Sequence, residues 1–202
     1  MKKKIRIAIL GANNSGKRRL CNDFSEATNI PIADLPITKI AEKYHLTTKE
    51  SVVKQSSTSP KEGIRFTTDL IMQRERLVKS TQNDLITTDT CLETYILYLI
   101  FNSFWDVSSH SLTLKKLTLS NLREFTHIFL VKGSYPFLTT NEEHTINPVF
   151  HQMYQDLLIS FLKKYITEII YPINQYISQD ARNAEESKHM VVEHMRRIVG
   201  KI

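Results

Sequence analysis

The feature that most constrains the fold is a short apolar run that leads directly into a glycine-bounded loop. Residues 4–10 read KIRIAIL, and residues 11–17 read GANNSGK. The apolar run predicts a buried strand, and Leu20, Phe24 and Ala27 then recur at the spacing of a helix. A strand, a glycine-bounded loop and a helix in this order provide the context of the pattern G-x-x-x-x-G-K-[ST], which the loop matches in its first seven positions.

This pattern holds phosphate groups for identifiable physical reasons. Glycine tolerates positive φ, so Gly11 and Gly16 let the backbone wrap around an anion. The loop amides and the positive end of the following helix then face the phosphates, and Lys17 reaches the β- and γ-phosphates. The residues expected to contact a nucleotide are Gly11, Asn13, Asn14, Ser15, Gly16, Lys17, Arg18 and Arg19. The other interpretation is a glycine-rich turn that binds nothing.

Arg18 occupies the one position that departs from the pattern. A Ser or Thr there supplies the hydroxyl that contacts Mg²⁺. A guanidinium cannot ligate a metal, and it pairs more readily with a phosphate or a carboxylate. The loop therefore predicts ATP as the ligand, and it lacks one expected ligand of the Mg²⁺ that usually accompanies ATP.

The positive charge of the chain is concentrated around this loop. The first 55 residues carry 11 Lys and Arg against 5 Asp and Glu, whereas the rest of the chain carries 16 of each. A local positive field attracts a polyanionic ligand. The first 55 residues contain neither a long basic run nor an interleaved aromatic patch, so a nucleotide is favoured over a nucleic acid.

The sequence also restricts the compartment. The longest apolar runs, 95–101 and 128–131, are too short to span a bilayer. The start MKKK is like that of a signal peptide, but the polar loop ends the apolar stretch too early. We therefore expect a cytoplasmic protein without a membrane partner, in which Cys21 and Cys91 are free thiols. The sequence gives no indication of the oligomeric state.

Beyond the loop, strand and helix patterns alternate. Further strands are expected at 29–33, 84–88 and 126–131 and within 173–178, and further helices at 37–44, 66–78, 92–104, 148–170 and 179–199. Residues 112–119 alternate apolar with polar residues, which suits a strand, but this periodicity alone does not decide between a strand and a helix. The polar stretches 46–62 and 133–147 predict loops, and Asn147 is placed to cap the helix that starts at Pro148. Such alternation predicts one α/β domain over 1–202, with a parallel sheet and helices on both of its faces.

In a sheet of this kind, ligands bind beyond the carboxyl ends of the strands. Three places satisfy that condition: the loop after the first strand, Asp89 after the strand at 84–88, and the polar loop after Val131.

With these places identified, the chain resembles the small P-loop kinases of nucleosides and nucleotides. It is most similar to the family that includes the ribosylnicotinamide kinase domain and the deoxynucleoside kinases. In that family a helix carrying a Gln leads into a strand ending in Asp-Arg, and an apolar helix follows. Here IMQR at 71–74 leads into DLITTDT at 84–90 and ETYIL at 93–97. The resemblance implies a P-loop NTPase-type, doubly wound parallel sheet.

The resemblance also implies roles for single residues. Lys17 would be catalytic on the donor side, and Asp89 would be the base or the carboxylate that holds the metal. Asp34 and Gln73 would bind the acceptor, and Arg182 would border the adenine. Two of these residues have simpler interpretations as well. Asp89 could cap the helix that starts near Cys91, and Gln73 could be a solvated helix residue.

Three departures from the family pattern concern turnover. Arg18 replaces the hydroxyl, Thr90 replaces the family's Arg, and the loop 133–147 has no Lys or Arg, with His144 as its only residue able to become cationic. The favoured function is an ATP-dependent phosphotransferase acting on a nucleoside, a nucleotide or a similar small acceptor. The alternative is a nucleotide-binding regulator or subunit that has lost turnover.

Overall fold

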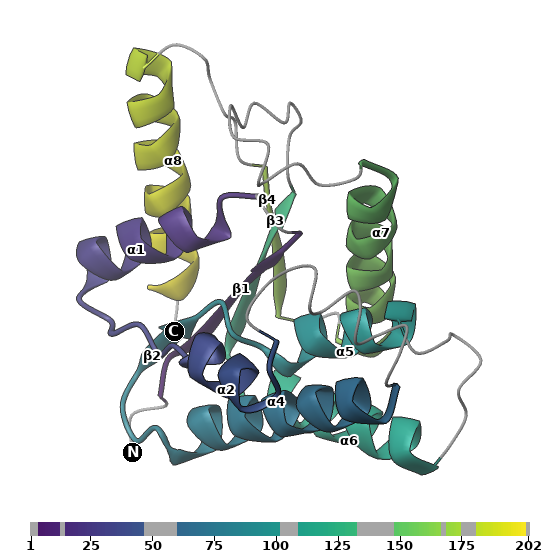
Figure 1. Cartoon of the computed structure of the whole chain (residues 1–202). Coiled ribbons are helices and arrows are strands. Elements are labelled where there is room, and N and C mark those ends of the chain that lie inside the picture. Colours follow the sequence, from purple (N-terminus) through teal and green to yellow (C-terminus); the bar gives the residue numbers. More distant parts are fainter. Residues whose placement is uncertain are drawn as a thin grey trace. The chain divides into compact units, whose positions relative to one another are not determined.

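The computed structural model describes residues 4–12, 15–46, 60–101, 109–132, 148–166, 169–174 and 181–200. Strands and helices alternate along much of this chain (Figure 1). In chain order they are β1 (Arg6–Gly11), α1 (Lys17–Thr28), α2 (Ile37–Lys43), α4 (Pro60–Ser80), β2 (Leu85–Thr87), α5 (Cys91–Phe101), α6 (Ser109–Leu122), β3 (His127–Lys132), α7 (Pro148–Tyr165), β4 (Ile170–Asn174) and α8 (Ala181–Val199).

Contacts between Cα atoms divide the chain into two compact units. The first unit contains Met1–Ile32, Asn83–Thr88 and Phe125–Ile202, and thus β1 to β4 with α1, α7 and α8. The second contains Ala33–Gln82 and Asp89–Glu124, with α2, α4, α5 and α6. That residues 1–202 form one domain stays a prediction.

The sheet of the first unit has four parallel strands in the order β2-β1-β3-β4. An isolated parallel bridge between Ile32 and Ile86 continues it beyond β2. Within the described residues, this bridge is all that forms of the strand expected at 29–33. Pro31 has no N–H to donate, although its carbonyl accepts the N–H of Ile86 at 2.9 Å.

The segment around β4 differs in its bounds from the expectation. The helix expected at 148–170 ends at Tyr165, and the strand expected within 173–178 starts at Ile170. Pro172 disfavours helical backbone at the residue before it, and the Ile-Tyr pair that precedes it favours a strand. β4 lies at the edge of the sheet, where a proline is tolerated.

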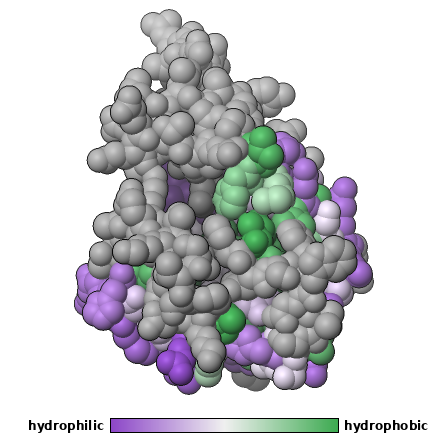
Figure 2. All heavy atoms as spheres, turned by 45° about the vertical axis from the view of Figure 1, so that its right-hand side comes forward, coloured by the Kyte–Doolittle hydropathy of each residue, from purple (hydrophilic) through white to green (hydrophobic). Residues whose placement is uncertain are grey.

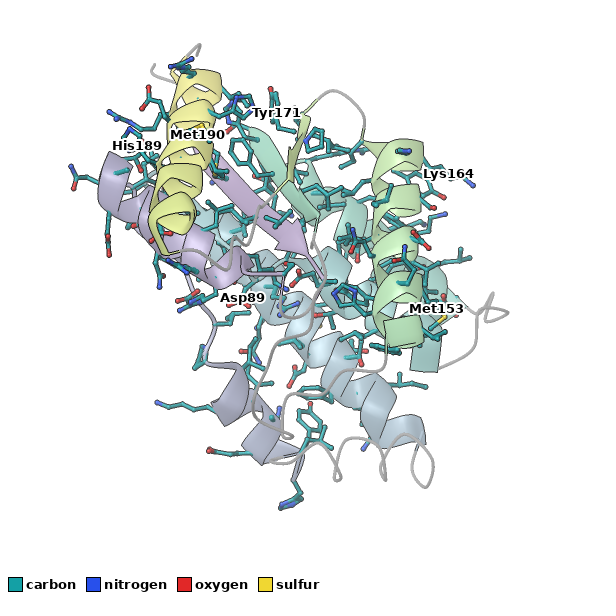
Figure 3. The ribbon with its side chains drawn as sticks, turned by 90° about the horizontal axis from the view of Figure 1, so that it is seen from above. Asp89, Met153, Lys164, Tyr171, His189 and Met190 are labelled. Carbon is teal, nitrogen blue, oxygen red and sulfur yellow. The ribbon has the colours of Figure 1, made fainter. Side chains whose placement is uncertain are left out.

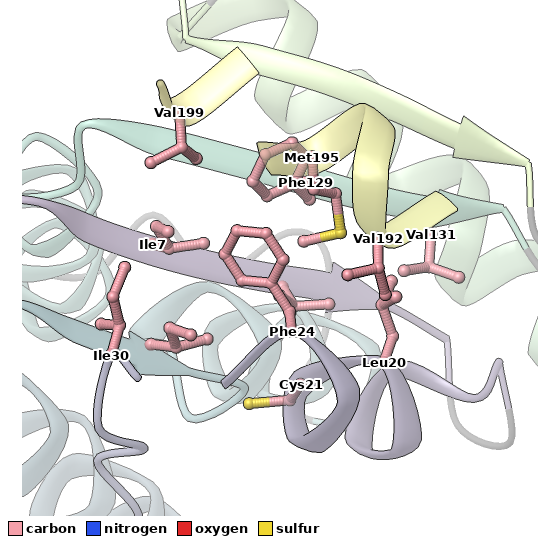
Figure 4. Close-up of a cluster of buried hydrophobic side chains, with 12 residues drawn as sticks. Ile7, Leu20, Cys21, Phe24, Ile30, Phe129, Val131, Val192, Met195 and Val199 are labelled. Carbon is pink, nitrogen blue, oxygen red and sulfur yellow. The ribbon is translucent and has the colours of Figure 1, made fainter. Parts of the chain in front are cut away.

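The core of the first unit lies between the sheet and the helices α1 and α8 (Figure 4). Ile7 and Ile9 alternate along β1 and so point to the same face. They are fully buried together with Phe24 of α1 and Met195 of α8. The ring of Phe24 lies 6.2 Å from that of Phe129 on β3. α7 lies on the other side of the sheet (Figures 1 and 3), so the expected helices on both faces are confirmed.

The second unit is helical. α4, α5 and α6 pack on one another, and α2 packs on α4. α5 is buried over much of its length, in keeping with its apolar sequence. Lys43 and Tyr44, at the end of α2, both donate to Oδ2 of Asp69 on α4, each at 2.8 Å. The ring of Tyr44 also lies 5.5 Å from that of Phe66.

Residues 112–119, for which the sequence left a strand and a helix open, belong to helix α6. The buried residues of α6 recur at helical rather than alternate spacing: Ser111, Leu114, Thr118, Asn121 and Leu122. Most of them are small or polar, whereas the side chain of Leu112 is 51% exposed. Of the alternating leucines, Leu114 therefore belongs to the buried face and Leu112 does not.

The remaining expectations concern loops and surface. The loop expected at 46–62 is described only at its ends, where Pro60 already begins α4, and residues 133–147 with Asn147 lie outside the described part. Among the described helices, none combines the length and apolar character that crossing a membrane requires. Figure 2 shows a hydrophobic area on one face, and on α7 the side chains of Val149 and Met153 are 76% and 37% exposed.

Candidate functional site

The two glycines of the loop after β1 are required for different reasons. Gly16, at the N-cap of α1, has a φ of 78°, a left-handed conformation that glycine adopts without steric cost. Gly11 ends β1 and leaves no room for a side chain. A Cβ there would lie 2.6 Å from Oγ of Ser15 and 2.9 Å from the carbonyl oxygen of Val131 on β3. Close packing thus requires Gly11, and backbone conformation requires Gly16.

Lys17 is held against the loop. It is the first residue of α1 and is half-buried. Its Nζ donates to the carbonyl oxygens of Gly11 at 3.0 Å and of Ala12 at 3.4 Å. The ammonium group therefore stays beside the loop backbone instead of extending into solvent.

Ser15 carries a polar atom that the described part of the protein leaves unsatisfied. Its side chain is buried, and its Oγ has no hydrogen-bond partner among the described residues. A buried hydroxyl without a partner costs about 1–3 kcal/mol. Such an atom is expected where a water molecule or a ligand completes the site.

The charges at the start of α1 favour an anion. Lys17, Arg18 and Arg19 are consecutive, both arginines are exposed, and the first turn contains no acidic residue. The helix dipole adds a partial positive charge at the same end. These groups fit a polyphosphate. They do not fit Mg²⁺, because Arg18 offers donors where the metal needs an oxygen ligand.

Three residues that were predicted to contact the nucleotide are not part of the geometry described above. Asn13 and Asn14 lie outside the described residues. Arg182 lies in the first turn of α8, in the first unit.

Asp89 lies in the second unit, two residues after the end of β2, and is buried. Its Oδ1 pairs with Nη2 of Arg74 at 3.3 Å, and its Oδ2 accepts the N–H of Leu35 at 2.8 Å. Both carboxylate oxygens are thus engaged. The roles of base and metal ligand stay predictions for Asp89, and either would require one of these bonds to be exchanged.

The guanidinium of Arg74 is the centre of this buried polar cluster. Arg74 lies on α4, and its Nη1 donates to the carbonyl oxygen of Thr90 at 2.6 Å and to Oγ1 of Thr94. Thr90 stands at the position where the sequence resemblance to nucleoside kinases would place an arginine. A guanidinium therefore does reach this turn, but it comes from the helix that precedes β2.

The other two acceptor candidates flank this cluster. Asp34 is exposed and adjoins Leu35, whereas Gln73 is half-buried and adjoins Arg74. The second unit therefore brings the neighbours of both residues into contact with Asp89. The sequence did contain a signal for Arg74, because Arg74 lies at helical spacing from Ile71 and Val78 and so shares the buried face of α4 with them. A charge on such a face requires a buried partner.

Cys91, the first residue of α5, is not suited to nucleophilic chemistry. Burial raises the pKa of its thiol to about 12, so the reactive thiolate is scarce at neutral pH. Its Sγ lies 3.2 Å from the carbonyl oxygen of Ile71, and its N–H donates to Oδ1 of Asn121 at 3.1 Å. Cys91 thus helps to join α4, α5 and α6.

The solved structures with a fold similar to that of this chain include a deoxyadenosine kinase and NadR. The deoxyadenosine kinase from M. mycoides, solved with dCMP and dCDP, has a TM-score of 0.64 and 14% identity, over 96% of this chain and all of the kinase chain. The NadR protein in complex with NR has a TM-score of 0.60 and 12% identity, over 98% of this chain. This chain spans about half of NadR, 51% of its length. The described chain therefore has the fold of the P-loop kinases.

No protein-family model matches the sequence, and no curated protein matches it.

Proposed function

We propose that this protein binds ATP at the loop Gly11–Lys17 and transfers a phosphoryl group to a nucleoside, a nucleotide or a similar small hydroxyl acceptor. The geometry of the loop is the observation that carries the proposal. A left-handed Gly16 leads into α1, Gly11 admits no side chain, and Lys17 is held at the loop. The fold shared with a deoxyadenosine kinase supports the same reaction class.

Phosphoryl transfer requires that two substrates be aligned and that the charge on the transferred group be neutralised. On the donor side, Lys17 would neutralise the phosphates, and Arg182 would border the adenine. On the acceptor side, the exposed Asp34 would accept a hydrogen bond from a sugar hydroxyl, and Gln73 would bond the base. Asp89 would act as the base or hold the metal only after giving up its bond to Arg74 or to the N–H of Leu35.

ATP binding is tested by calorimetry on wild type and Lys17→Ala. The substitution removes the ammonium that would contact the phosphates, and we expect the affinity to fall by at least about tenfold, equivalent to about 1.4 kcal/mol. Lys39→Ala is the matched control, because Lys39 is exposed on α2 in the second unit. An affinity that Lys17→Ala leaves unchanged would contradict nucleotide binding at this loop.

Turnover is tested separately, by incubating the wild-type protein with ATP and Mg²⁺ and a panel of nucleosides and their monophosphates. We expect a phosphorylated product from at least one acceptor. Asp34→Asn keeps a side chain of the same size and removes the charge, so it should raise the KM for the acceptor more than the KM for ATP.

A second function, nucleotide binding without transfer, is favoured by two observations. Arg18 replaces the metal-binding hydroxyl, and both oxygens of Asp89 are already engaged. The protein would then be a regulator or a subunit whose nucleotide acts as a signal. Tight ATP binding combined with no transfer and no hydrolysis across the panel would establish this function in place of the first.

A further inference from the structure

The residue that follows Lys17 determines whether a loop of this pattern supplies a ligand to the metal ion. A Ser or Thr hydroxyl there binds Mg²⁺ together with the phosphates. Arg18 is exposed in the first turn of α1 and carries five N–H donors and no acceptor. It therefore cannot ligate a cation, and its charge repels one.

The nearest alternative hydroxyl in the described part of the loop does not replace the missing one. Ser15 is 2% exposed, and its Oγ lies against Gly11, 2.6 Å from where a Cβ on that residue would stand. It is therefore packed into the loop, where it can complete a hydrogen bond with a bound anion or water. A metal ion needs several oxygen ligands at close distance, and this enclosed hydroxyl offers one.

The carboxylate that the kinase resemblance would assign to the metal is also engaged. Asp89 pairs with Arg74 at 3.3 Å and accepts the Leu35 N–H at 2.8 Å. If Asp89 turned to a metal, the buried guanidinium of Arg74 would lose its counter-charge, which is costly.

Cationic side chains of the protein stand where they can neutralise the phosphate charge that Mg²⁺ would otherwise neutralise. Lys17, Arg18 and Arg19 are consecutive in the first turn of α1, beside the positive end of the helix dipole, and this turn contains no acidic residue. The unsatisfied Oγ of Ser15 is a second and independent indication of a ligand at this helix end.

We propose that the loop binds a nucleoside triphosphate as the free, metal-free polyanion, with Arg18 in the place of the metal ion. This inference rests on the proposed nucleotide binding and adds the form in which the nucleotide is bound. Added Mg²⁺ then brings no gain in affinity, since it competes with Arg18 for the same phosphate charge.

The test is calorimetry of ATP binding to the full chain, once with excess MgCl₂ and once with EDTA at equal ionic strength. For the wild type we expect the Kd with Mg²⁺ to equal or exceed the Kd with EDTA. Arg18→Thr restores the hydroxyl, and we expect Mg²⁺ then to tighten ATP binding by at least about fivefold. Arg19→Thr removes the same charge without a hydroxyl at position 18, so it should weaken binding in both buffers alike.

The outcomes separate the two proposals. Wild-type ATP binding that Mg²⁺ tightens by about twofold or more overturns metal-free binding and leaves the proposed function standing. If Mg²⁺ changes the Kd for ATP by the same factor in wild type and in Arg18→Thr, the role given to Arg18 is overturned as well. Absence of ATP binding in both buffers overturns the proposed function, and metal-free binding with it. Circular dichroism of each variant confirms that it is folded.

Discussion

Arg74 is a cation buried inside the second unit, with its charge matched by Asp89 and its donors spread over the turn that follows β2. Its side chain and that of Asp89 are 6% and 10% exposed. Burying two ions costs several kcal/mol each, and the cost is offset only when both remain paired. The pair therefore holds α4 against the start of α5, and it also fixes Leu35 through the second oxygen of Asp89.

Removal of the guanidinium should reveal this dependence. In Arg74→Met the volume is largely kept and Asp89 becomes an unpaired buried charge, so we expect the free energy of unfolding to fall by about 3–5 kcal/mol. The measurement is urea unfolding followed by circular dichroism. Arg76→Met is the control, because Arg76 is exposed on the same helix, and a change there should stay within about 0.5 kcal/mol.

A double-mutant cycle decides whether the loss comes from the charge pair. Asp89→Asn in the Arg74→Met background removes the stranded charge and keeps an acceptor for Leu35, so part of the lost stability should return. If the double variant is as unstable as the sum of the single variants, packing rather than the ion pair holds this cluster.

The candidate site could be predicted from the sequence only where a contiguous motif encodes it. Gly16 and Lys17 belong to one local pattern, and their geometry agrees with it. Arg74, the ion-pair partner of Asp89, lies fifteen residues earlier in the sequence, on α4. No local pattern encodes such a contact, since it depends on which face α4 turns toward α5.

At the scale of elements, the end of α2 is bound to α4 through the carboxylate of Asp69, which accepts hydrogen bonds from both Lys43 and Tyr44. Hydrogen bonds from Lys43 and from Tyr44 lower the pKa of Asp69. The folded protein therefore holds this carboxyl proton more weakly than the unfolded chain does. The resulting stabilisation is complete above the pKa of the unfolded chain, about 4, and it is lost as the pH falls through the lower folded value.

This linkage predicts a specific pH dependence. The urea midpoint of wild type should exceed that of Asp69→Asn at pH 6, and the difference should shrink as the pH falls below about 4. Tyr44→Phe removes one of the two donors and should show a smaller acid-dependent loss than wild type. If the urea midpoints of wild type and Asp69→Asn run parallel from pH 6 to pH 3, the contact of α2 with α4 does not depend on the charge of Asp69.

The elements themselves were predictable where a continuous apolar run is also buried, as in β1, β3 and α5. They were not predictable where tertiary contacts decide the outcome. α6 buries Ser111, Thr118 and Asn121, whose side chains are small enough to pack closely against α4 and α5. A hydrophobic pattern cannot identify such a face, and the alternating leucines left strand and helix undecided. Likewise, Pro31 reduced an expected strand to one bridge.

At the scale of the whole molecule, the two units alternate along the chain. The chain consists of five segments that belong in turn to the first and the second unit. Strand β2 lies on a short segment of the first unit, Asn83–Thr88, between the two segments of the second unit. Neither unit is therefore a continuous piece of chain that could be removed intact. We infer that the two units unfold together, as the single domain predicted from the sequence would.

The two cysteines can report on this, because each unit contains one of them and both are buried. Cys21 lies on α1 in the first unit, and Cys91 begins α5 in the second. Pulse alkylation in increasing urea, read by mass spectrometry, gives the fraction of each unit that is unfolded. We expect both thiols to become reactive at the same urea concentration, and Cys21→Ser and Cys91→Ser confirm which signal belongs to which thiol.

Adding ATP to the same measurement tests whether the two units are coupled, because the proposed ATP site lies in the first unit. A ligand that binds only the folded state stabilises it by about 2.7 kcal/mol at one hundred times its Kd. If the chain unfolds as one domain, ATP should raise the labelling midpoints of Cys21 and Cys91 equally, although Cys91 belongs to the other unit. A shift confined to Cys21 would mean that the units unfold independently, and that the stability of the Arg74–Asp89 cluster is not linked to nucleotide binding.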